Sequence, residues 1–271
     1  MPLEGSRAKS RRAKQHLDAL DASVRAFLDS KPYRVRVESD LERGHYVVRV
    51  DNDPPPMPTD EWALLIGDCA HNMRSALDYI TWECAYGRGD RQTMFPIFRD
   101  EKNFDAAARS MLRHLSPRMR TAIKAVQPYH APDPTFTNLW VIHALDNADK
   151  HRLLTLTIGI QDAVDVTFTV PAYTTVAHQT DLFPNVLLVR DAVVAEIAIT
   201  PPNPGVQVKA EFSPEISFGE GVGFGLRAYA VATLRGALAN LDSLLDSFFE
   251  VLANDPDAPS AGLLGRRDAC P

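Results

Sequence analysis

The stretch V-D-V-T-F-T-V at residues 164–170 divides this chain of 271 residues into two kinds of sequence. Apolar and polar side chains alternate along it, and most of its residues are β-branched, which is typical of a strand with one buried face. The same alternation returns three times downstream, with proline or glycine at the breaks. We therefore predict an antiparallel β meander over 159–222, with strands at 164–170, 174–178, 186–200 and 206–218.

Outside this region the apolar residues recur every three or four positions, which is the period of an amphipathic helix. Proline and glycine punctuate the pattern and separate one helix from the next. Trp62, Trp82 and Trp140 fall within such segments, so we expect them to anchor the core. The expected helices cover residues 10–28, 61–86, 104–115, 117–126, 135–157 and 224–252.

Two short alternating segments, 33–37 and 46–50, flank a turn at Gly44 and predict a β-hairpin after the first helix. The expected fold is therefore α+β, in which a helical layer packs on an antiparallel β meander, with an N-terminal helix and hairpin. No repeat or long linker divides the chain, so we expect a single domain over 1–253 and a flexible tail over 254–271. The parts of this domain are a helix-rich region at 1–158, the meander at 159–222 and the final helix at 223–253.

Composition, charge and cysteine spacing limit the classes of protein to which this chain can belong. The chain is 45% hydrophobic and carries a net charge of −6 at pH 7, which is typical of a globular protein and argues against a broad nucleic-acid-binding surface. No apolar run approaches the roughly 20 residues that span a bilayer, and the basic start lacks the apolar stretch of a signal peptide. Cys69 and Cys84 lie about four turns apart on one expected helix, too far to form a disulfide. We therefore expect a cytoplasmic protein with reduced thiols and no membrane partner.

Two polar clusters that contain histidines interrupt otherwise good helical sequence. They are G-D-C-A-H-N-M-R-S-A-L-D at 67–78 and H-A-L-D-N-A-D-K-H-R at 143–152. Charged side chains at this density are costly in a packed helix unless they pair with one another or with a ligand. On a helical wheel the polar residues of each cluster gather on one face. We therefore predict that the two helices share a polar groove, with the Cα atoms of His71 and Asp146 within about 10 Å, the usual spacing of packed helices.

The segment R-S-A-L-D-Y at 74–79 is similar to the R-polar-x3-H motif of the HEPN superfamily, whose members include helical-bundle ribonucleases and toxin components. In that family the arginine stabilises phosphate charge and the histidine acts in general acid–base catalysis. In this chain Tyr79 stands where the family has its histidine. The resemblance implies a protein that acts on RNA, with His71 or His151 supplying the missing base.

Four motifs in order, H-N-x-R-S-A-L-D, F-P-I, Q-P-Y and L-D-N-x-D-K-H-R, resemble an uncharacterised bacterial protein family. This resemblance covers about residues 61–154. It implies that the two polar clusters belong together, and it does not indicate a substrate.

The leading hypothesis is a HEPN-like protein that binds or cleaves RNA or a nucleotide. In this hypothesis cationic side chains meet phosphate, histidines transfer protons, and aspartates orient the histidines. The expected catalytic residues are His71, Arg74, Asp78, Asp146, Asp149 and His151, and the expected ligand-binding residues are Asn72, Asn147, Lys150 and Arg152.

Two other hypotheses stay open. In the first, this is a non-enzymatic binding or assembly protein whose clusters form a satisfied network that fixes the register of the helices. In the second, Asp68-x-x-His71 and His143-x-x-Asp146 bind a metal, an arrangement that resembles carboxylate-bridged di-metal bundles. Those bundles use the longer glutamate, so we assign no metal ligand and no cofactor to the chain. The sequence leaves open whether the protein forms a homo-oligomer.

Overall fold

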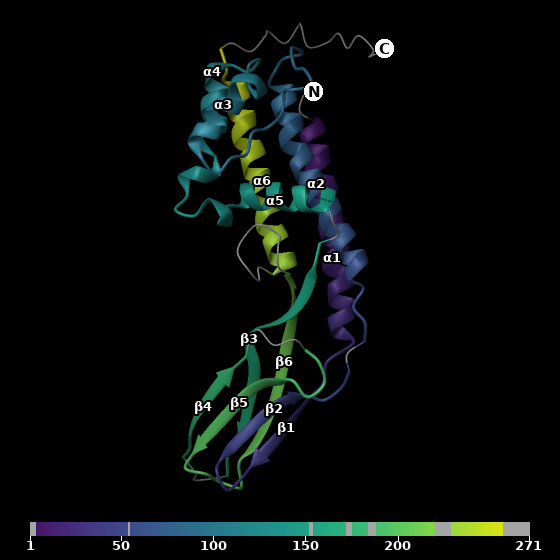
Figure 1. Ribbon diagram of the computed structural model, residues 1–271, viewed down its shortest axis with the longest axis vertical. Helices are drawn as coiled ribbons and strands as arrows, with labels where there is room; N and C mark the ends of the chain where they lie inside the picture. Colours follow the sequence, from purple (N-terminus) through teal and green to yellow (C-terminus); the bar gives the residue numbers. More distant parts are fainter. Residues whose placement is uncertain are drawn as a thin grey trace. The chain divides into compact units, whose positions relative to one another are not determined.

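The computed structural model describes residues 4–53, 55–151, 154–171, 175–183, 188–219 and 229–256, without the side chains of 158–166 and 211–214 (Figure 1). Its helices are α1 (Glu4–Asp29), α2 (Thr59–Glu83), α3 (Glu101–Met111), α4 (Pro117–Ala125), α5 (Asn138–His151) and α6 (Ala230–Ala253), with 3-10 turns η1 (Pro128–His130) and η2 (Pro134–Phe136). Its strands are β1 (Val35–Asp40), β2 (His45–Val50), β3 (Leu156–Thr169), β4 (Ala177–Leu182), β5 (Val193–Thr200) and β6 (Gln207–Phe218), all paired antiparallel.

The predicted α+β class is confirmed. None of the described helices is long and apolar enough to cross a bilayer.

Contacts within the chain group it into two compact units. Unit 1 comprises Met1–Asp21, Asp60–Thr155 and Gly219–Pro271, and unit 2 comprises Ala22–Thr59 and Leu156–Phe218. The chain therefore passes from one unit to the other four times, at the ends of these segments. The expectation of a single domain stays a prediction.

The first residues of the predicted tail are anchored within unit 1. Asp255 is buried, and its carboxylate accepts hydrogen bonds from the hydroxyl of Ser116 and, at 3.3 Å, from that of Tyr86. Residues 257–271 lie outside the described residues.

Helices α1, α2 and α6 supply much of the core of unit 1. Ala13, Leu17 and Leu20 form a buried stripe on α1, and Ser10 of the same stripe donates a hydrogen bond to Asp242 of α6. Helix α2 buries the apolar face opposite its polar cluster. The members of that buried face are Cys69, Met73, Ala76, Leu77, Ile80 and Cys84, and both cysteines are free thiols.

Helix α5 is shorter than the helix predicted over 135–157. It begins at Asn138 because the hydroxyl of Thr137 accepts the backbone N–H of Trp140 at 3.3 Å and caps the first turn. It ends at His151, and the segment L-T-L-T-I at 154–158 leads into β3 instead. This segment alternates like a strand, and pairing with β6 supplies its backbone hydrogen bonds. The predicted helix was therefore wrong at both ends.

Unit 2 contains a four-stranded sheet in the order β1-β2-β5-β4 and a separate pair of β3 with β6. The predicted hairpin is confirmed as β1 and β2, and Gly44 takes a φ of 65° in its turn. The predicted meander was wrong in strand order, because β5 lies between β2 and β4 while β3 pairs with β6. Alternation of side chains marks a strand and its buried face, but it does not identify the partner strand.

The core of unit 2 lies on the inward faces of its central strands. The hydroxyl of Tyr46 reaches the backbone carbonyl of Val206 at 3.3 Å, so this buried polar group is satisfied. The buried apolar residues of β2 and β5 are Tyr46, Val48, Val50, Val194, Ala195, Ile197 and Ile199.

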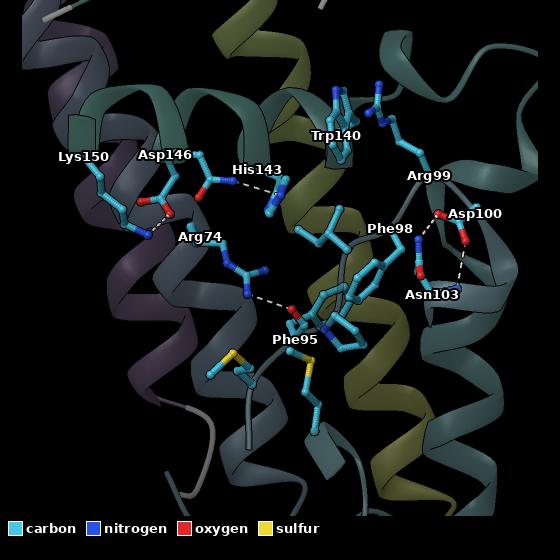
Figure 2. Close-up of a pocket in the computed structure, with 15 residues that line it drawn as sticks. Arg74, Phe95, Phe98, Arg99, Asp100, Asn103, Trp140, His143, Asp146 and Lys150 are labelled. Carbon is cyan, nitrogen blue, oxygen red and sulfur yellow. Dashed lines mark hydrogen bonds and ion pairs between the residues drawn. The ribbon is translucent and has the colours of Figure 1, made fainter. Parts of the chain in front are cut away.

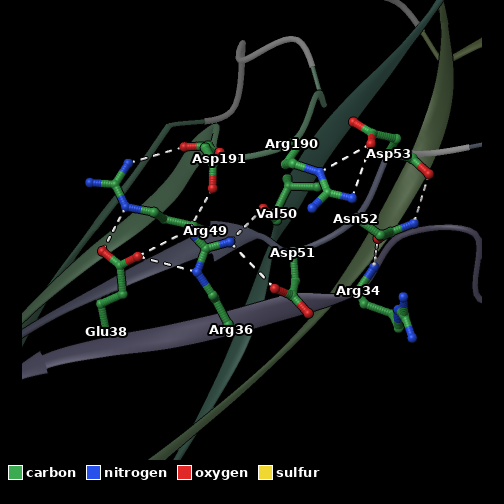
Figure 3. Close-up of polar contacts among 10 residues, drawn as sticks. All are labelled: Arg34, Arg36, Glu38, Arg49, Val50, Asp51, Asn52, Asp53, Arg190 and Asp191. Carbon is green, nitrogen blue, oxygen red and sulfur yellow. Dashed lines mark hydrogen bonds and ion pairs between the residues drawn. The ribbon is translucent and has the colours of Figure 1, made fainter.

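A network of charged side chains joins β1, β2 and the turn before β5 (Figure 3). Arg36 pairs with Glu38 at 3.0 Å and with Asp191 at 2.5 Å. Arg49 donates to the Glu38 carboxylate at 2.8 Å and to the Asp191 backbone carbonyl at 3.0 Å. Asp191 takes a φ of 67°, which is uncommon for a residue other than glycine. The two arginines therefore support a left-handed turn at the start of β5.

This network predicts an acid-sensitive contribution to stability. Hydrogen bonds from Arg49 and Arg36 lower the pKa of Glu38, and the bond from Arg36 lowers the pKa of Asp191. Such a carboxylate stabilises the fold above its unfolded-state pKa of about 4, and the contribution is lost as the pH falls through the folded-state pKa. We expect the difference in melting temperature between the parent and Glu38→Gln to shrink as the pH is lowered from about 7 to about 3. A difference that does not change with pH would contradict this role.

Candidate functional site

The two polar clusters meet where α5 crosses α2. His71 Nδ1 lies 3.0 Å from Asp146 Oδ1, so the prediction that these residues come together is confirmed. Asp146 is only 2% exposed, and its second oxygen accepts a hydrogen bond from Lys150 Nζ at 2.6 Å. The buried carboxylate thus has two partners, a half-exposed imidazole on one side and an ammonium group on the other.

A pocket of about 430 Å³ opens beside this junction (Figure 2). Helices α2, α3 and α5 and the loop that precedes α3 contribute to its wall. The pocket combines cationic, amide and aromatic side chains with an apolar floor. Its lining residues are Arg74, Met94, Phe95, Pro96, Ile97, Phe98, Arg99, Asp100, Asn103, Met111, Trp140, His143, Asp146, Asn147 and Lys150.

Side chains from α2 and from the segment after α4 clamp the loop at 95–98. Arg74 Nη2 donates to the carbonyl of Phe95 at 2.7 Å, and Asp78 accepts the N–H of the same residue at 2.8 Å. The buried side chain of Gln127, which follows α4, accepts the Phe98 N–H at 3.1 Å and donates to the Pro96 carbonyl at 2.9 Å. One wall of the pocket is therefore held by four hydrogen bonds between side chain and backbone.

Asp78 belongs to this clamp. Besides Phe95 it accepts a hydrogen bond from Arg74 at 3.0 Å, and among the described residues it makes no contact with a histidine. Burial raises the pKa of Asp78, and the charge of Arg74 and the Phe95 N–H oppose that shift. The expected role of Asp78 in orienting a base stays a prediction, while its contacts are those of a structural group.

Arg74 is the most deeply placed cation of the pocket. Its side chain is 13% exposed, and its Nη2 is occupied by Asp78 and Phe95. Its Nη1 is buried and has no hydrogen-bond partner among the described residues. A guanidinium group has five N–H donors, and a buried donor without an acceptor is costly. Arg74 can therefore donate a hydrogen bond to a further anionic or carbonyl partner.

A second cation lies on the opposite side of the pocket (Figure 2). The guanidinium of Arg99 stacks 4.6 Å from the ring centre of Trp140. In the part of the chain that the structure describes, Arg99 forms no ion pair and no hydrogen bond. The stack leaves its N–H groups available, while cation–π attraction holds its plane in place.

His143 stands between these two cations. Its ring centre lies 5.0 Å from that of Trp140, and its Nε2 lies 2.9 Å from the side-chain nitrogen of Asn147. Burial, and after it the nearby charge of Arg74, lowers the pKa of His143 to about 4. The ring is neutral at pH 7, accepts from Asn147 at Nε2 and carries its proton on Nδ1.

Several residues expected in the site lie away from the pocket lining. Asn72 is buried and donates to the backbone carbonyl of Asp68 at 2.8 Å, and His151 is exposed. Asp149 lies against Gly67, and burial together with Asp68 and Asp146 raises its pKa. Arg152 lies outside the described residues.

Tyr79, which occupies the histidine position of the HEPN-like motif, faces α1. Its ring contacts Gly5, and the ammonium of Lys9 lies 5.8 Å from the ring centre. It is not among the residues that line the pocket beside Arg74. A base that works with Arg74 would have to come from another position.

The residues of the metal hypothesis are not gathered into one ligand set. Asp68 lies 3.8 Å from His16, His143 contacts Asn147, and His71 contacts Asp146. Among the described residues no group of three or more His, Cys, Asp or Glu side chains is arranged to hold a metal ion.

Phe98, Arg99, Asn103 and Trp140 are among the pocket residues that sequence reasoning did not assign to a site. Trp140 was expected to anchor the core, although it precedes His143 by three positions and so shares its helical face. That spacing was the one available signal for Trp140. The other three lie on the loop before α3 and at its start, outside both clusters, and their place depends on the clamp described above.

No protein-family model, curated protein or solved structure matches this chain. The resemblances drawn from the sequence therefore stay expectations. A candidate function rests on the pocket's own residues.

Proposed function

We propose that this protein binds a nucleotide, free or as part of single-stranded RNA, in the pocket beside Arg74. The observation that carries the proposal is that Arg74, which lines the pocket, has a buried Nη1 with no partner among the described residues. A phosphate oxygen would satisfy this donor with a charge-assisted hydrogen bond.

The charge of the lining supports an anionic ligand. Three cations, Arg74, Arg99 and Lys150, face two carboxylates, Asp100 and Asp146. Both carboxylates already have partners: Asp100 caps α3 through the N–H of Asn103, and Asp146 is held by Lys150 and His71. The carboxylates are therefore engaged, while Nη1 of Arg74 and the guanidinium of Arg99 keep unused donors, which suits phosphate.

The ring surfaces of the pocket support a planar ligand group. Trp140, Phe98 and the neutral ring of His143 line it, and stacking on such rings is how proteins hold bases without sequence preference. A volume of about 430 Å³ is in the range of small-molecule sites. A nucleotide combines a planar base with a phosphate, and so uses both features of the lining.

The four motifs of the bacterial family and the HEPN-like segment support the same location. The F-P-I motif forms the clamped wall, Gln127 of Q-P-Y holds it, and the two polar clusters supply Arg74 and Lys150. If RNA is cleaved, His71 is the base we propose, because Asp146 orients it and Tyr79 faces away. We propose the cytoplasm as the compartment, where buried thiols stay reduced.

The alternative is a non-enzymatic binding or assembly protein, and one observation favours it. Arg74, Asp78 and Gln127 all hold the loop at 95–98, so part of the polar network is structural. If the protein is such an assembly protein, Arg99, which takes no part in the clamp, would have no role in binding a nucleotide.

We expect the parent protein to bind nucleoside monophosphates or a short single-stranded RNA, and Arg99→Ala to weaken binding on the order of tenfold, the value of one hydrogen bond to a charged group. Binding is measured by isothermal titration calorimetry with each of the four monophosphates and by fluorescence anisotropy with a labelled RNA. Arg99→Ala should lower the melting temperature only slightly, because the one interaction it is known to lose within the described part of the chain is the stack on Trp140, worth about 0.5–1 kcal/mol at an exposed site.

The matched control is Arg109→Ala, which removes an exposed arginine of α3 that does not line the pocket. Equal affinities of the Arg99 and Arg109 variants would reject this pocket as the binding site. No binding of any of these ligands by the parent would favour the assembly protein.

A further inference from the structure

The hydroxyl of Ser75 on α2 lies beside a histidine of the same helix. A serine or threonine within a helix commonly bonds back to the carbonyl four residues earlier. Thr81, Thr121, Ser243 and Ser247 do so, at 2.8 to 3.1 Å. The Ser75 hydroxyl instead lies 3.5 Å from Nε2 of His71, one turn earlier on the same helix.

The partner ring is oriented by a carboxylate from another helix. Asp146 Oδ1 lies 3.0 Å from His71 Nδ1 and accepts a hydrogen bond from its N–H, so in the neutral ring the lone pair is on Nε2, the atom nearest Ser75. Asp146 is 2% exposed and is itself held by Lys150 at 2.6 Å. The three side chains form a chain of hydroxyl, imidazole and buried carboxylate, which is how an activated nucleophile is recognised.

The site is accessible from solvent. The side chain of His71 is 55% exposed, and Ser75 is half-buried beside it. A distance of 3.5 Å between nucleophile and base is long for a hydrogen bond, and such pairs are often longer without substrate than with it.

We propose that Ser75, His71 and Asp146 form a nucleophilic triad that hydrolyses carboxylic esters with good leaving groups. The triad shares His71 with the proposed step of RNA cleavage and Asp146 with the pocket lining, but Ser75 and the ester substrate are not part of the nucleotide-binding proposal. The activity therefore does not rest on the function proposed above.

The reaction is an acyl transfer without oxidation or reduction. The Ser75 oxygen attacks the ester carbonyl carbon while its proton passes to His71 Nε2. The carbon–oxygen bond to the leaving group then breaks, and the leaving alkoxide or phenoxide takes that proton. Water attacks the acyl-serine in the same way, releases the carboxylic acid and restores the hydroxyl, while Asp146 stabilises the imidazolium in each half.

The position of Ser75 within the helix limits the substrate class. Residues 59–83 form a continuous α-helix, so the N–H groups around Ser75 are used within it and cannot form an oxyanion hole. Aryl esters, whose leaving group needs little help, are therefore the expected substrates, and amides are not.

The test uses a fluorophosphonate probe on the full chain. Attack of the Ser75 oxygen on phosphorus forms a P–O bond and expels fluoride, and the proton passes to His71. We expect intact mass and peptide mapping to find the adduct on Ser75, and Ser75→Ala to abolish it. His71→Gln should slow labelling roughly a hundredfold, the lower range for loss of a general base. Hydrolysis of 4-nitrophenyl acetate should follow the same order of variants.

The matched control is Ser243→Ala, which removes an exposed hydroxyl that bonds back to its own helix and should leave labelling unchanged. Melting temperatures of all variants show that each is folded. No adduct on Ser75 at saturating probe, or equal labelling rates of the parent and His71→Gln, would overturn the triad. Nucleotide affinity of Ser75→Ala is expected to equal that of the parent, so failure of one proposal is distinguishable from failure of the other.

Discussion

Replacing Arg74 by alanine is expected to lower the free energy of unfolding by about 2–3 kcal/mol, the cost of leaving hydrogen-bond acceptors without their charged donor, because solvent partly screens the 36% exposed side chain of Asp78. The change leaves the Asp78 carboxylate without its cation and the Phe95 carbonyl without its donor. Burial already raises the pKa of Asp78, and Arg74 is the first of the groups that oppose this shift. Urea denaturation at pH 7 measures the loss.

The double variant Arg74→Ala/Asp78→Asn separates charge from packing. Because the uncompensated carboxylate causes most of the cost, the double variant is expected to be more stable than Arg74→Ala alone. A loss below about 1 kcal/mol for Arg74→Ala, the size typical of solvent-facing positions, would contradict the buried clamp. Nucleotide affinity of the same variant then shows whether Arg74 also binds ligand, a question that its stability alone does not answer.

Gly67→Ala is expected to lower the free energy of unfolding by about 1–3 kcal/mol, as overpacking of a tight contact does. A Cβ atom at Gly67 would lie 2.1 Å from Asp149 Oδ1 and 2.4 Å from its Cγ, so the carboxylate of α5 must move. The substitution would otherwise raise helix propensity by about 1 kcal/mol, so a net loss identifies the contact as its cause. Chemical denaturation measures the change.

Gly236→Ala in α6 is the matched control. The nearest atom to a Cβ there is Asn138 Oδ1 at 3.6 Å, an ordinary contact, so this variant is expected to be as stable as the parent or more stable. The double variant Gly67→Ala/Asp149→Ala also removes the carboxylate that the new Cβ would meet, and it should recover most of the lost free energy of unfolding. If Gly67→Ala is as stable as Gly236→Ala, α2 and α5 do not approach as closely as the structure places them.

Local patterns predicted the helices and the strands because the two periods, 3.6 and 2, are properties of neighbouring residues. They also predicted that the polar faces of α2 and α5 meet, because a buried aspartate such as Asp146 needs partners. They failed at the end of α5, where residues 154–158 join β6 across a gap of about 60 positions, as in the pairing of Leu156 with Phe218. No window of local sequence contains that partner.

The sequence by itself determined the α+β class, the N-terminal hairpin, the buried face of α2 and the contact between the two polar clusters. Each of these follows from the spacing of side chains along one or two segments. Only the tertiary structure decided the order of the strands, the wall of the pocket and the line from Ser75 through His71 to Asp146. The physical reason is that these features depend on hydrogen bonds between distant segments, such as those from Asp78 and Gln127 to a loop 17 to 31 positions away.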